Sequence, residues 1–343
     1  MYKIAISPMK ERNIIISNTA AKIGLHEAII EKDFWVCLML DYLFHKSPWG
    51  NHLAFKGGTS LSKAYHVIER FSEDIDLILD WRLVGYELAE PWDTRSRTKQ
   101  KAFNEEANQR TAELLKVEFL PRMNEDLDKL IGCPNCLSIA EDLDNKDCEQ
   151  TVIFRYPKAF TVDSILPEIR LEFGALAAWT PLEEKTIMPI IGEQYPQTFT
   201  QLDTQIRTTA VERAFWEKAT ILHREANRPE GSLMPMRYAR HYYDLYCLYN
   251  SPYRESILSS LDLLKQVGEF KNKFYYNSWA EYSKAWPGTF KLTPSENNFE
   301  RLRKDYQDMR AMIYGNYPAF EKLMEAMANI ETEINSLPLE VDS

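Results

Sequence analysis

The most constraining feature of this sequence is a short segment in which an apolar run, two glycines and two aspartates follow one another. Leu53-Ala54-Phe55 leads into Lys56-Gly57-Gly58-Thr59-Ser60, and a helical pattern then runs from Leu61 to Ile68. The alternating residues 72–79 come next. We therefore predict a strand, a tight turn, a helix and a second strand, with the glycines where the backbone turns sharply.

The second strand carries two carboxylates. Side chains two residues apart in a strand point the same way, so Asp74 and Asp76 are expected on one face while Ile75 enters the core. Neighbouring carboxylates repel each other unless a cation lies between them, and oxygen ligands favour Mg²⁺ or Mn²⁺ over zinc. The backbone N–H groups near Thr59 form a complementary anion pocket. Either feature alone is more often solvated charge or an ordinary turn, but together they predict a site for a metal-bound triphosphate.

A third acidic ligand is expected from a neighbouring strand. In the segment 165–173, alternation places Ile169 and Leu171 on the core face and Glu172 on the opposite face. Glu172 is therefore the candidate. Glu168 has the same parity but lies nearer the beginning of the strand, and it is the alternative.

The chain of 343 residues is long enough for two domains, and its 45% apolar content supports a sizeable core. One amphipathic helix is expected over residues 23–45, a charged helical stretch over 92–130, and strands over 151–156 and 165–173. Beyond about residue 205 the pattern becomes helical, over 209–226, 235–248, 257–270, 298–313 and 317–335. We predict an α/β half (1–205) followed by an all-helical half (206–343).

Composition excludes several classes of protein. Lys and Arg number 41 against 51 Asp and Glu, and the resulting charge of −10 argues against a nonspecific nucleic-acid coat protein. The sequence has neither an apolar run of transmembrane length nor a signal peptide at its start, so we expect a cytoplasmic protein without membrane contact. Five irregularly spaced cysteines fit a reducing compartment, and Cys133 and Cys136, with Cys148 nearby, are expected to be loop thiols.

Four motifs occur in an order that resembles a known family. They are Ile30-Glu-Lys-Asp-Phe-Trp-Val; Phe55-Lys-Gly-Gly-Thr-Ser with Arg70-Phe-Ser-Glu-Asp-Ile-Asp-Leu; Val211-Glu-Arg-Ala-Phe-Trp-Glu-Lys; and Arg240-His-Tyr-Tyr-Asp-Leu-Tyr. The chain from about Ile30 to Leu248 resembles the nucleotidyltransferase toxins of the AbiEii/AbiGii family, a branch of the polymerase-β superfamily. This resemblance implies a mixed-sheet nucleotidyltransferase core with a helical C-terminal lobe.

The resemblance also implies roles for particular residues. The triphosphate would be held by Gly57, Gly58, Thr59 and Ser60, with Lys56 and Arg240 in the same nucleotide-binding set. Metal ions would be bound by Asp74 and Asp76, and Glu172, the candidate from strand alternation, would complete the metal site. Lys218 would contact phosphate or developing negative charge, and Asp244 matches the acidic residue of the last motif. On helical spacing alone, Lys218 can project into a cleft between lobes, and Arg240 can pair with Asp244. In this sequence Thr59-Ser60 follows two glycines, whereas the superfamily more commonly has Gly-Ser, so the resemblance does not specify which hydroxyl would contact phosphate.

The reaction that the resemblance implies is Mg²⁺-dependent transfer of a nucleotide from a nucleoside triphosphate to RNA, with the acceptor end of tRNA as the favoured target. Such a protein would be a type IV toxin or abortive-infection protein that blocks translation and is neutralised by an antitoxin encoded nearby. The basic residues expected to contact RNA are Arg95, Arg97, Lys99, Lys101, Arg224, Arg228, Arg237 and Arg240. Three alternatives remain: transfer to a protein or small-molecule hydroxyl, a binding module without activity, and a DxD glycosyltransferase. The last leaves the glycine turn and the helical motifs unexplained.

Overall fold

The computed structural model describes residues 1–72, 74–141, 149–162, 165–177 and 180–338. The chain forms two compact units. The first contains Met1–Tyr65 and Phe71–Thr209, and the second contains His66–Arg70 and Ala210–Ser343. The sequence placed a boundary between residues 205 and 206, which falls within the last strand of the first unit, β7 (Thr204–Thr209).

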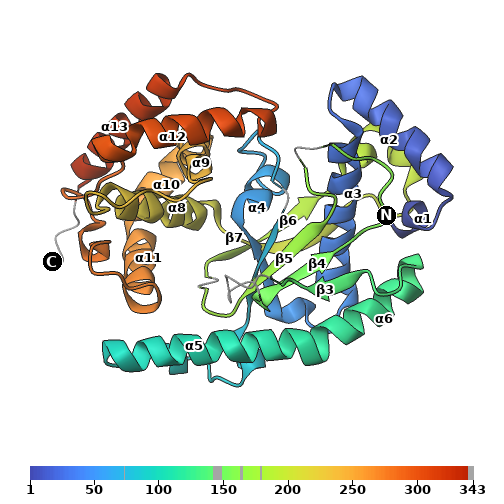
Figure 1. Cartoon of the computed structure of the whole chain (residues 1–343), viewed down its shortest axis with the longest axis horizontal. Helices are drawn as coiled ribbons and strands as arrows, with labels where there is room; N and C mark the ends of the chain where they lie inside the picture. Colours follow the sequence, from blue (N-terminus) through green and yellow to red (C-terminus); the bar gives the residue numbers. More distant parts are fainter. Residues whose placement is uncertain (73, 142–148, 163–164, 178–179, 339–343) are drawn as a thin grey trace. The chain divides into compact units, whose positions relative to one another are not determined.

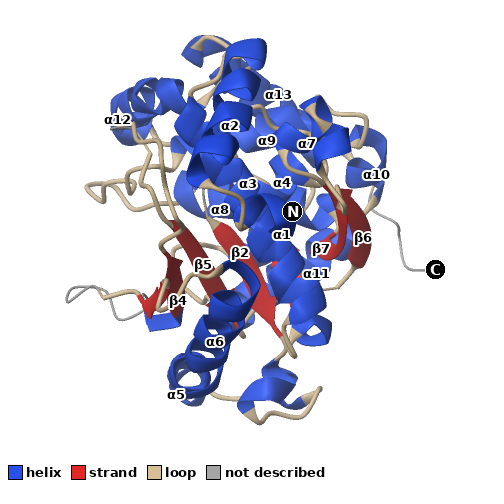
Figure 2. Ribbon diagram, turned by 90° about the vertical axis from the view of Figure 1, so that its right-hand side faces the viewer, coloured by secondary structure: helices blue, strands red, loops and turns tan. Residues whose placement is uncertain are grey.

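The first unit is built on a seven-stranded mixed sheet with the strand order β3-β4-β5-β2-β1-β7-β6. Figure 2 shows β5 and β2 side by side, and these two strands run parallel. The strands are β1 (Leu53–Lys56), β2 (Ile75–Leu79), β3 (Leu137–Ile139), β4 (Thr151–Phe154), β5 (Ile169–Gly174), β6 (Leu182–Ile187) and β7. The α/β class is confirmed. The antiparallel pair β6 and β7 was missed, because the largely polar β6 gives little signal of a buried strand.

One face of the sheet is apolar and supports the core. Trp35 of α3 (Glu27–Asp41) packs edge-on against Phe154, with ring centroids 6.1 Å apart. Phe119 packs in the same way against Phe173 at 5.6 Å. Phe119 closes the π-helical turn that joins α5 (Arg97–Leu114) to α6 (Leu120–Ile131), and Figure 1 shows these helices as one long rod. These aromatic contacts bury large apolar areas on one face of the sheet. The other face carries both the buried cluster of Ala54, Ile78 and Ala177 and the polar residues described below.

The expected amphipathic helix over residues 23–45 is wrong in two respects. The helix α2 (Met9–Ile23) ends at Gly24, whose φ is 73°, and α3 then begins at Glu27. Moreover, α3 is buried on nearly all sides, including its central charged residues Glu31, Lys32 and Asp33. Each of these three makes a hydrogen bond with a distant backbone group: Ala159 N at 2.9 Å, Leu166 O at 2.9 Å and Ile190 N at 2.7 Å, respectively. These three side chains therefore hydrogen-bond to loop residues and to the first residue of α7 (Ile190–Gln194) instead of facing water.

The remaining helices of the first unit are short: α1 (Tyr2–Ala5), α4 (Gly57–Lys63) and α7 (Ile190–Gln194). The described part of the second unit is helical, as expected, but the predicted helix over 257–270 is divided between two helices. Its helices are α8 (Val211–Ala226), α9 (Ala239–Tyr249), α10 (Arg254–Ser259), α11 (Leu261–Phe274), α12 (Glu296–Asp308) and α13 (Phe320–Ser336). Within the described ranges, no helix is both long enough and apolar enough to cross a bilayer.

Candidate active site

The glycine turn at the start of α4 lies directly against Asp76. Gly57 has a φ of +81°, and a Cβ placed on it would lie 1.9 Å from Asp76 Oδ2. Only glycine fits here, since any side chain would displace the carboxylate and would also have to adopt a left-handed backbone. The turn and the second aspartate of the predicted pair are thus neighbours.

The two hydroxyls that follow the glycines are used within the chain. Thr59 Oγ1 donates to the carbonyl oxygen of Asp74 at 2.5 Å, and Ser60 Oγ donates to the carbonyl oxygen of Gly57 at 2.8 Å. Both residues are only 1% exposed. Because a hydroxyl has one proton to donate, neither side chain keeps a donor for a phosphate in this arrangement. The backbone amides of the turn are then the better candidates for that contact.

A row of polar residues crosses the sheet at the level of this turn. Lys56 on β1 is the register partner of Asp76 on β2, and Asp76 is the register partner of Glu172 on β5. Register partners point to the same side of a sheet, and neighbouring strands lie about 4.8 Å apart. The flanking residues Ile75 and Leu171 are buried on the other face, as the alternation predicts. A cation and two carboxylates therefore lie side by side on one face.

The donor set suits Mg²⁺ by its chemistry. Asp74 lies just before β2, which begins at Ile75, so it is outside the strand in which it was expected. Among the described residues, which do not include residue 73, no group of three or more His, Cys, Asp or Glu side chains could hold a metal ion. Mg²⁺, however, commonly binds through one or two carboxylates together with substrate phosphates. Asp76 and Glu172 meet that requirement.

Glu168, the alternative third ligand, lies outside β5 and has another partner. Its Oε2 is 3.8 Å from Arg155 Nε. Glu172 Oε1 lies 3.9 Å from Arg170 Nε, and the Glu172 side chain is 46% exposed. The register with Asp76 and this exposure both favour Glu172 over Glu168.

The helical unit holds the other two predicted residues in a buried ion cluster. Asp244 on α9 is fully buried, with Lys218 Nζ of α8 at 2.8 Å and Arg70 Nε at 2.7 Å. Arg70 Nη2 also donates to Asp244 Oδ2 at 2.8 Å, which completes a two-pronged contact. Burial on its own would raise the pKa of Asp244, but the two cations outweigh it and hold that pKa well below its ordinary value. Asp244 is therefore an anion.

The cluster bears on two predictions. Lys218 is 9% exposed and bound to Asp244, and its projection into a cleft between lobes stays a prediction. The pairing of Arg240 with Asp244 is wrong. Asp244 pairs with Arg70 and Lys218, and no ion pair in the described part of the chain joins it to Arg240. Helical spacing permits an i,i+4 contact, but a bidentate arginine from a distant segment offers better geometry.

Comparison with known proteins identifies the family. The family model described as "Nucleotidyl transferase AbiEii toxin, Type IV TA system" matches residues 40–328, which is most of the chain. The protein belongs to this AbiEii family. It is accordingly a nucleotidyltransferase toxin of a type IV toxin–antitoxin system.

A solved structure agrees with the fold of this AbiEii protein. The nucleotidyltransferase toxin MenT4 of Mycobacterium tuberculosis is similar with a TM-score of 0.52 and 16% sequence identity, over 96% of this chain and 91% of that one. At this identity the likeness concerns the fold. No curated protein sequence matches the chain.

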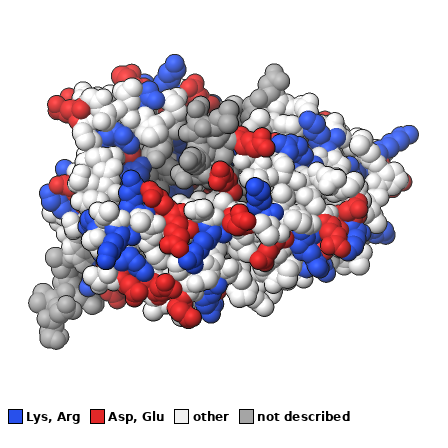
Figure 3. All heavy atoms as spheres, turned by 60° about the horizontal axis from the view of Figure 1, so that its bottom comes forward, with Lys and Arg blue, Asp and Glu red and all other residues white. Residues whose placement is uncertain are grey.

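Three of the basic residues predicted to contact RNA, Arg95, Arg224 and Arg228, are engaged within the AbiEii protein itself. Arg95 donates to the carbonyl oxygen of Glu90 at 2.8 Å, and its guanidinium lies 4.1 Å from the centroid of the Phe103 ring. Arg224 and Arg228 both pair with the buried Glu225, at 2.8 and 2.6 Å. On the face shown in Figure 3, Lys and Arg are interspersed with Asp and Glu. Any RNA contact must therefore be local.

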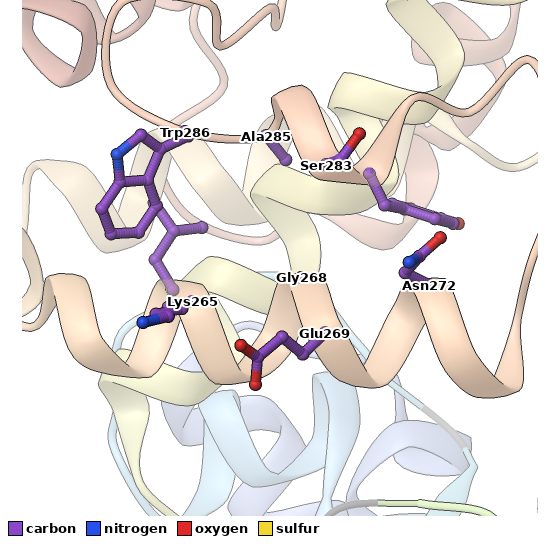
Figure 4. Close-up of a pocket in the computed structure, with 9 residues that line it drawn as sticks. Lys265, Gly268, Glu269, Asn272, Ser283, Ala285 and Trp286 are labelled. Atoms are coloured by element: carbon purple, nitrogen blue, oxygen red, sulfur yellow. The ribbon is translucent and has the colours of Figure 1, made fainter. Parts of the chain in front are cut away.

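A separate cavity of about 390 Å³ lies between α11 and the segment 282–286 of the helical unit. Figure 4 shows Lys265 and Trp286 at one end and Asn272 farther along the helix. The lining residues include none of the predicted site residues.

Two of the three cysteines expected to be loop thiols, Cys133 and Cys136, are free and buried, and Cys148 lies outside the described residues.

Sequence reasoning missed Arg70 and the pair formed by Asp33 and Lys63. Arg70 is the first residue of the motif that contains Asp74 and Asp76, and the sequence assigns it no role. In the structure it is 4% exposed and binds Asp244. Lys63 Nζ lies 2.7 Å from Asp33 Oδ1, and this pair links the C-terminal end of α4 to α3. For Asp33, the available signal was a charged residue within an otherwise apolar helical pattern. Such a residue is buried only when it has a partner, so its position indicates that a partner exists.

Proposed function

We propose that this AbiEii protein transfers a nucleotide from a nucleoside triphosphate to RNA in a Mg²⁺-dependent reaction, with the acceptor end of tRNA as the favoured target. The observation that carries the proposal is the row of Lys56, Asp76 and Glu172 beside the turn at Gly57. It brings together carboxylates for a metal, a cation for phosphate and a backbone turn that can approach a triphosphate closely. The family description supports the reaction type.

The chain's own groups have distinct roles in this proposal. Asp76 and Glu172 would hold the metal together with the phosphates of the substrate, and Asp74, from the same family motif, is proposed as a further ligand once the triphosphate is bound. Lys56 and the amides from Gly57 to Ser60 would bind the triphosphate. When bound, Mg²⁺ supplies charge neutralisation on the phosphates and lowers the pKa of the attacking hydroxyl. The acceptor hydroxyl attacks the α-phosphorus, the bond to pyrophosphate breaks, and Glu172 accepts the hydroxyl proton.

The helical unit contributes to the proposal through Lys218, Asp244 and Arg240, which the family motifs include. One N–H of the Lys218 ammonium group is directed to Asp244, and the group has three protons to donate. Lys218 therefore retains capacity for a phosphate oxygen while it remains paired. Arg240 stays in the proposed nucleotide-binding set.

Labelled nucleotides test this function directly. Each of the four labelled triphosphates would be incubated with Mg²⁺, total cellular RNA and the protein, and the labelled species identified. We expect label in tRNA with the wild-type protein and none with Asp76→Asn, whose fold is expected to be unchanged. Wild-type incorporation by Asp76→Asn would contradict the site assignment. Inhibition by rising salt is also expected, because phosphate contacts release counterions.

A second acceptor class is favoured by the charge distribution. The net charge of −10, the interspersed charges in Figure 3 and the internal pairing of Arg224 and Arg228 all fit a small or proteinaceous acceptor hydroxyl. The same incubation with RNA-free lysate would then label protein or a small molecule.

The biological role follows from the reaction and the family. Modification of the tRNA acceptor end would block translation, so expression of the protein alone should arrest growth. A neutralising antitoxin is proposed as its partner, because the family description names a toxin–antitoxin system. Growth arrest that persists with Asp76→Asn would show that toxicity has another cause.

A further inference from the structure

The chain visits the helical unit between the glycine helix α4 and the strand β2. Residues His66–Arg70 group with that unit, and the chain returns to the sheet-containing unit at Phe71. The backbone of Arg70 forms an antiparallel bridge with Ile313, and the amide of Tyr314 donates to the carbonyl oxygen of Glu69 at 3.0 Å. The chain between the glycine turn and β2 is thus attached to the helical unit at Glu69 and Arg70.

The side chain of Arg70 makes the strongest of these attachments. Its two nitrogens reach the two oxygens of Asp244 at 2.7 and 2.8 Å, and Arg70 is 4% exposed while Asp244 is 0% exposed. Burying charges costs solvation, so a paired contact of this kind is a poor way to gain stability alone. Its fixed fork geometry instead defines the position and orientation of the segment that carries it.

Asp74 follows Arg70 by four residues, and four residues span at most about 14 Å. The sheet ladder does not hold Asp74 itself, since β2 begins at Ile75. Its carbonyl oxygen accepts the hydrogen bond from Thr59. Arg70 is therefore fixed by Asp244 on the N-terminal side of the first aspartate, and the Thr59 hydroxyl binds the carbonyl oxygen of Asp74 itself.

We propose that Arg70 is a positioning residue for Asp74, and that Asp244 serves the reaction by holding Arg70 and not by touching the nucleotide. The inference rests on the proposed function, because it assumes that Asp74 is a metal ligand. Lys218 balances the charge of Asp244 in this arrangement. A change that weakens the two hydrogen bonds between Arg70 and Asp244 should lower the affinity for the metal before it unfolds the helical unit.

Arg70→Lys tests the proposal because lysine keeps the charge but loses the fork. We expect the Mg²⁺ concentration for half-maximal nucleotide transfer to rise roughly tenfold or more, as for other residues that orient metal ligands. Activity should recover in part at high Mg²⁺. Arg213→Lys is the matched control, since Arg213 is 2% exposed, lies in the same unit and pairs with Glu217 at 3.1 Å. An unchanged Mg²⁺ requirement in Arg70→Lys, or an equal rise in both variants, would overturn the proposal.

Hydrogen exchange provides a readout that does not need activity. Amides of residues 71–76 should exchange faster in Arg70→Lys than in the wild type and in Arg213→Lys. Should Arg70→Lys fail to fold, Asp244→Asn replaces it with the same expectation. Unchanged exchange over 71–76 refutes the anchor. A wild-type protein that transfers no nucleotide refutes the proposed function instead, and the exchange result still decides whether Arg70 positions the segment.

Discussion

The close contact between Gly57 and Asp76 makes a sharp prediction for Gly57→Ala. The added Cβ would lie 1.9 Å from Asp76 Oδ2, so the carboxylate must retreat by about 1.5 Å to reach ordinary contact at 3.4 Å. The backbone at φ +81° adds a conformational cost of about 1–2 kcal/mol. A displacement of this size at a reacting centre lowers activity by roughly 100-fold.

Gly231 supplies the matched control, because it has the same φ of +81° but no atom within 4 Å of its added Cβ. Both alanine variants should lose thermal stability, by about 2–4 °C for each kcal/mol. Only Gly57→Ala should lose nucleotide incorporation, measured with labelled triphosphate at saturating Mg²⁺. Similar activity in the two variants would refute the reasoning, because the contact with Asp76 would then have no consequence for the reaction.

Three further predictions concern groups that the structure buries. Thr59→Val, which removes the hydrogen bond to the Asp74 carbonyl, should lower the free energy of unfolding by about 1 kcal/mol and slow nucleotide transfer, while Ser62→Ala on the same helix should not slow it. Asp33→Ala leaves the buried Lys63 ammonium without its carboxylate and should cost about 3–5 kcal/mol in urea unfolding, much of which the double variant Asp33→Leu/Lys63→Met should restore. Burial lowers the pKa of His223 to about 4, so unfolded chains bind a proton there between pH 6.5 and 4 that the folded protein does not. Stability should therefore fall by on the order of 3 kcal/mol as the pH drops through that window, and a slope in His223→Asn as steep as in the wild type would contradict this.

Part of the candidate site could be predicted from local pattern. Alternation within each strand assigns Asp76 and Glu172 to the polar face of their own segments, because side chains in a strand point to opposite faces in turn. The glycine pair likewise indicates a tight turn from sequence alone. The predicted strand begins at residue 72, three residues before β2, and therefore includes Asp74, since strand ends depend on pairing partners that the pattern does not contain.

Other features depend on contacts between segments far apart in the chain. The register that aligns Lys56, Asp76 and Glu172 joins three strands, and residue order does not specify which strands become neighbours. The partner of Asp244 is Arg70, which lies 174 residues away, and not the nearby Arg240. Periodicity also could not reveal that Glu31 and Asp33 are buried, because a charged residue looks solvated until its distant partner is known.

The sequence by itself determined the element types, the faces on which the acidic side chains lie and the family motifs, because these are properties of residues close together in the chain. Only the tertiary structure decided which strands adjoin, which cation neutralises each buried carboxylate, and that Thr59 and Ser60 direct their hydroxyls to the backbone. Those outcomes depend on burial and pairing over long separations, where the energy of a contact exists only after the chain has folded.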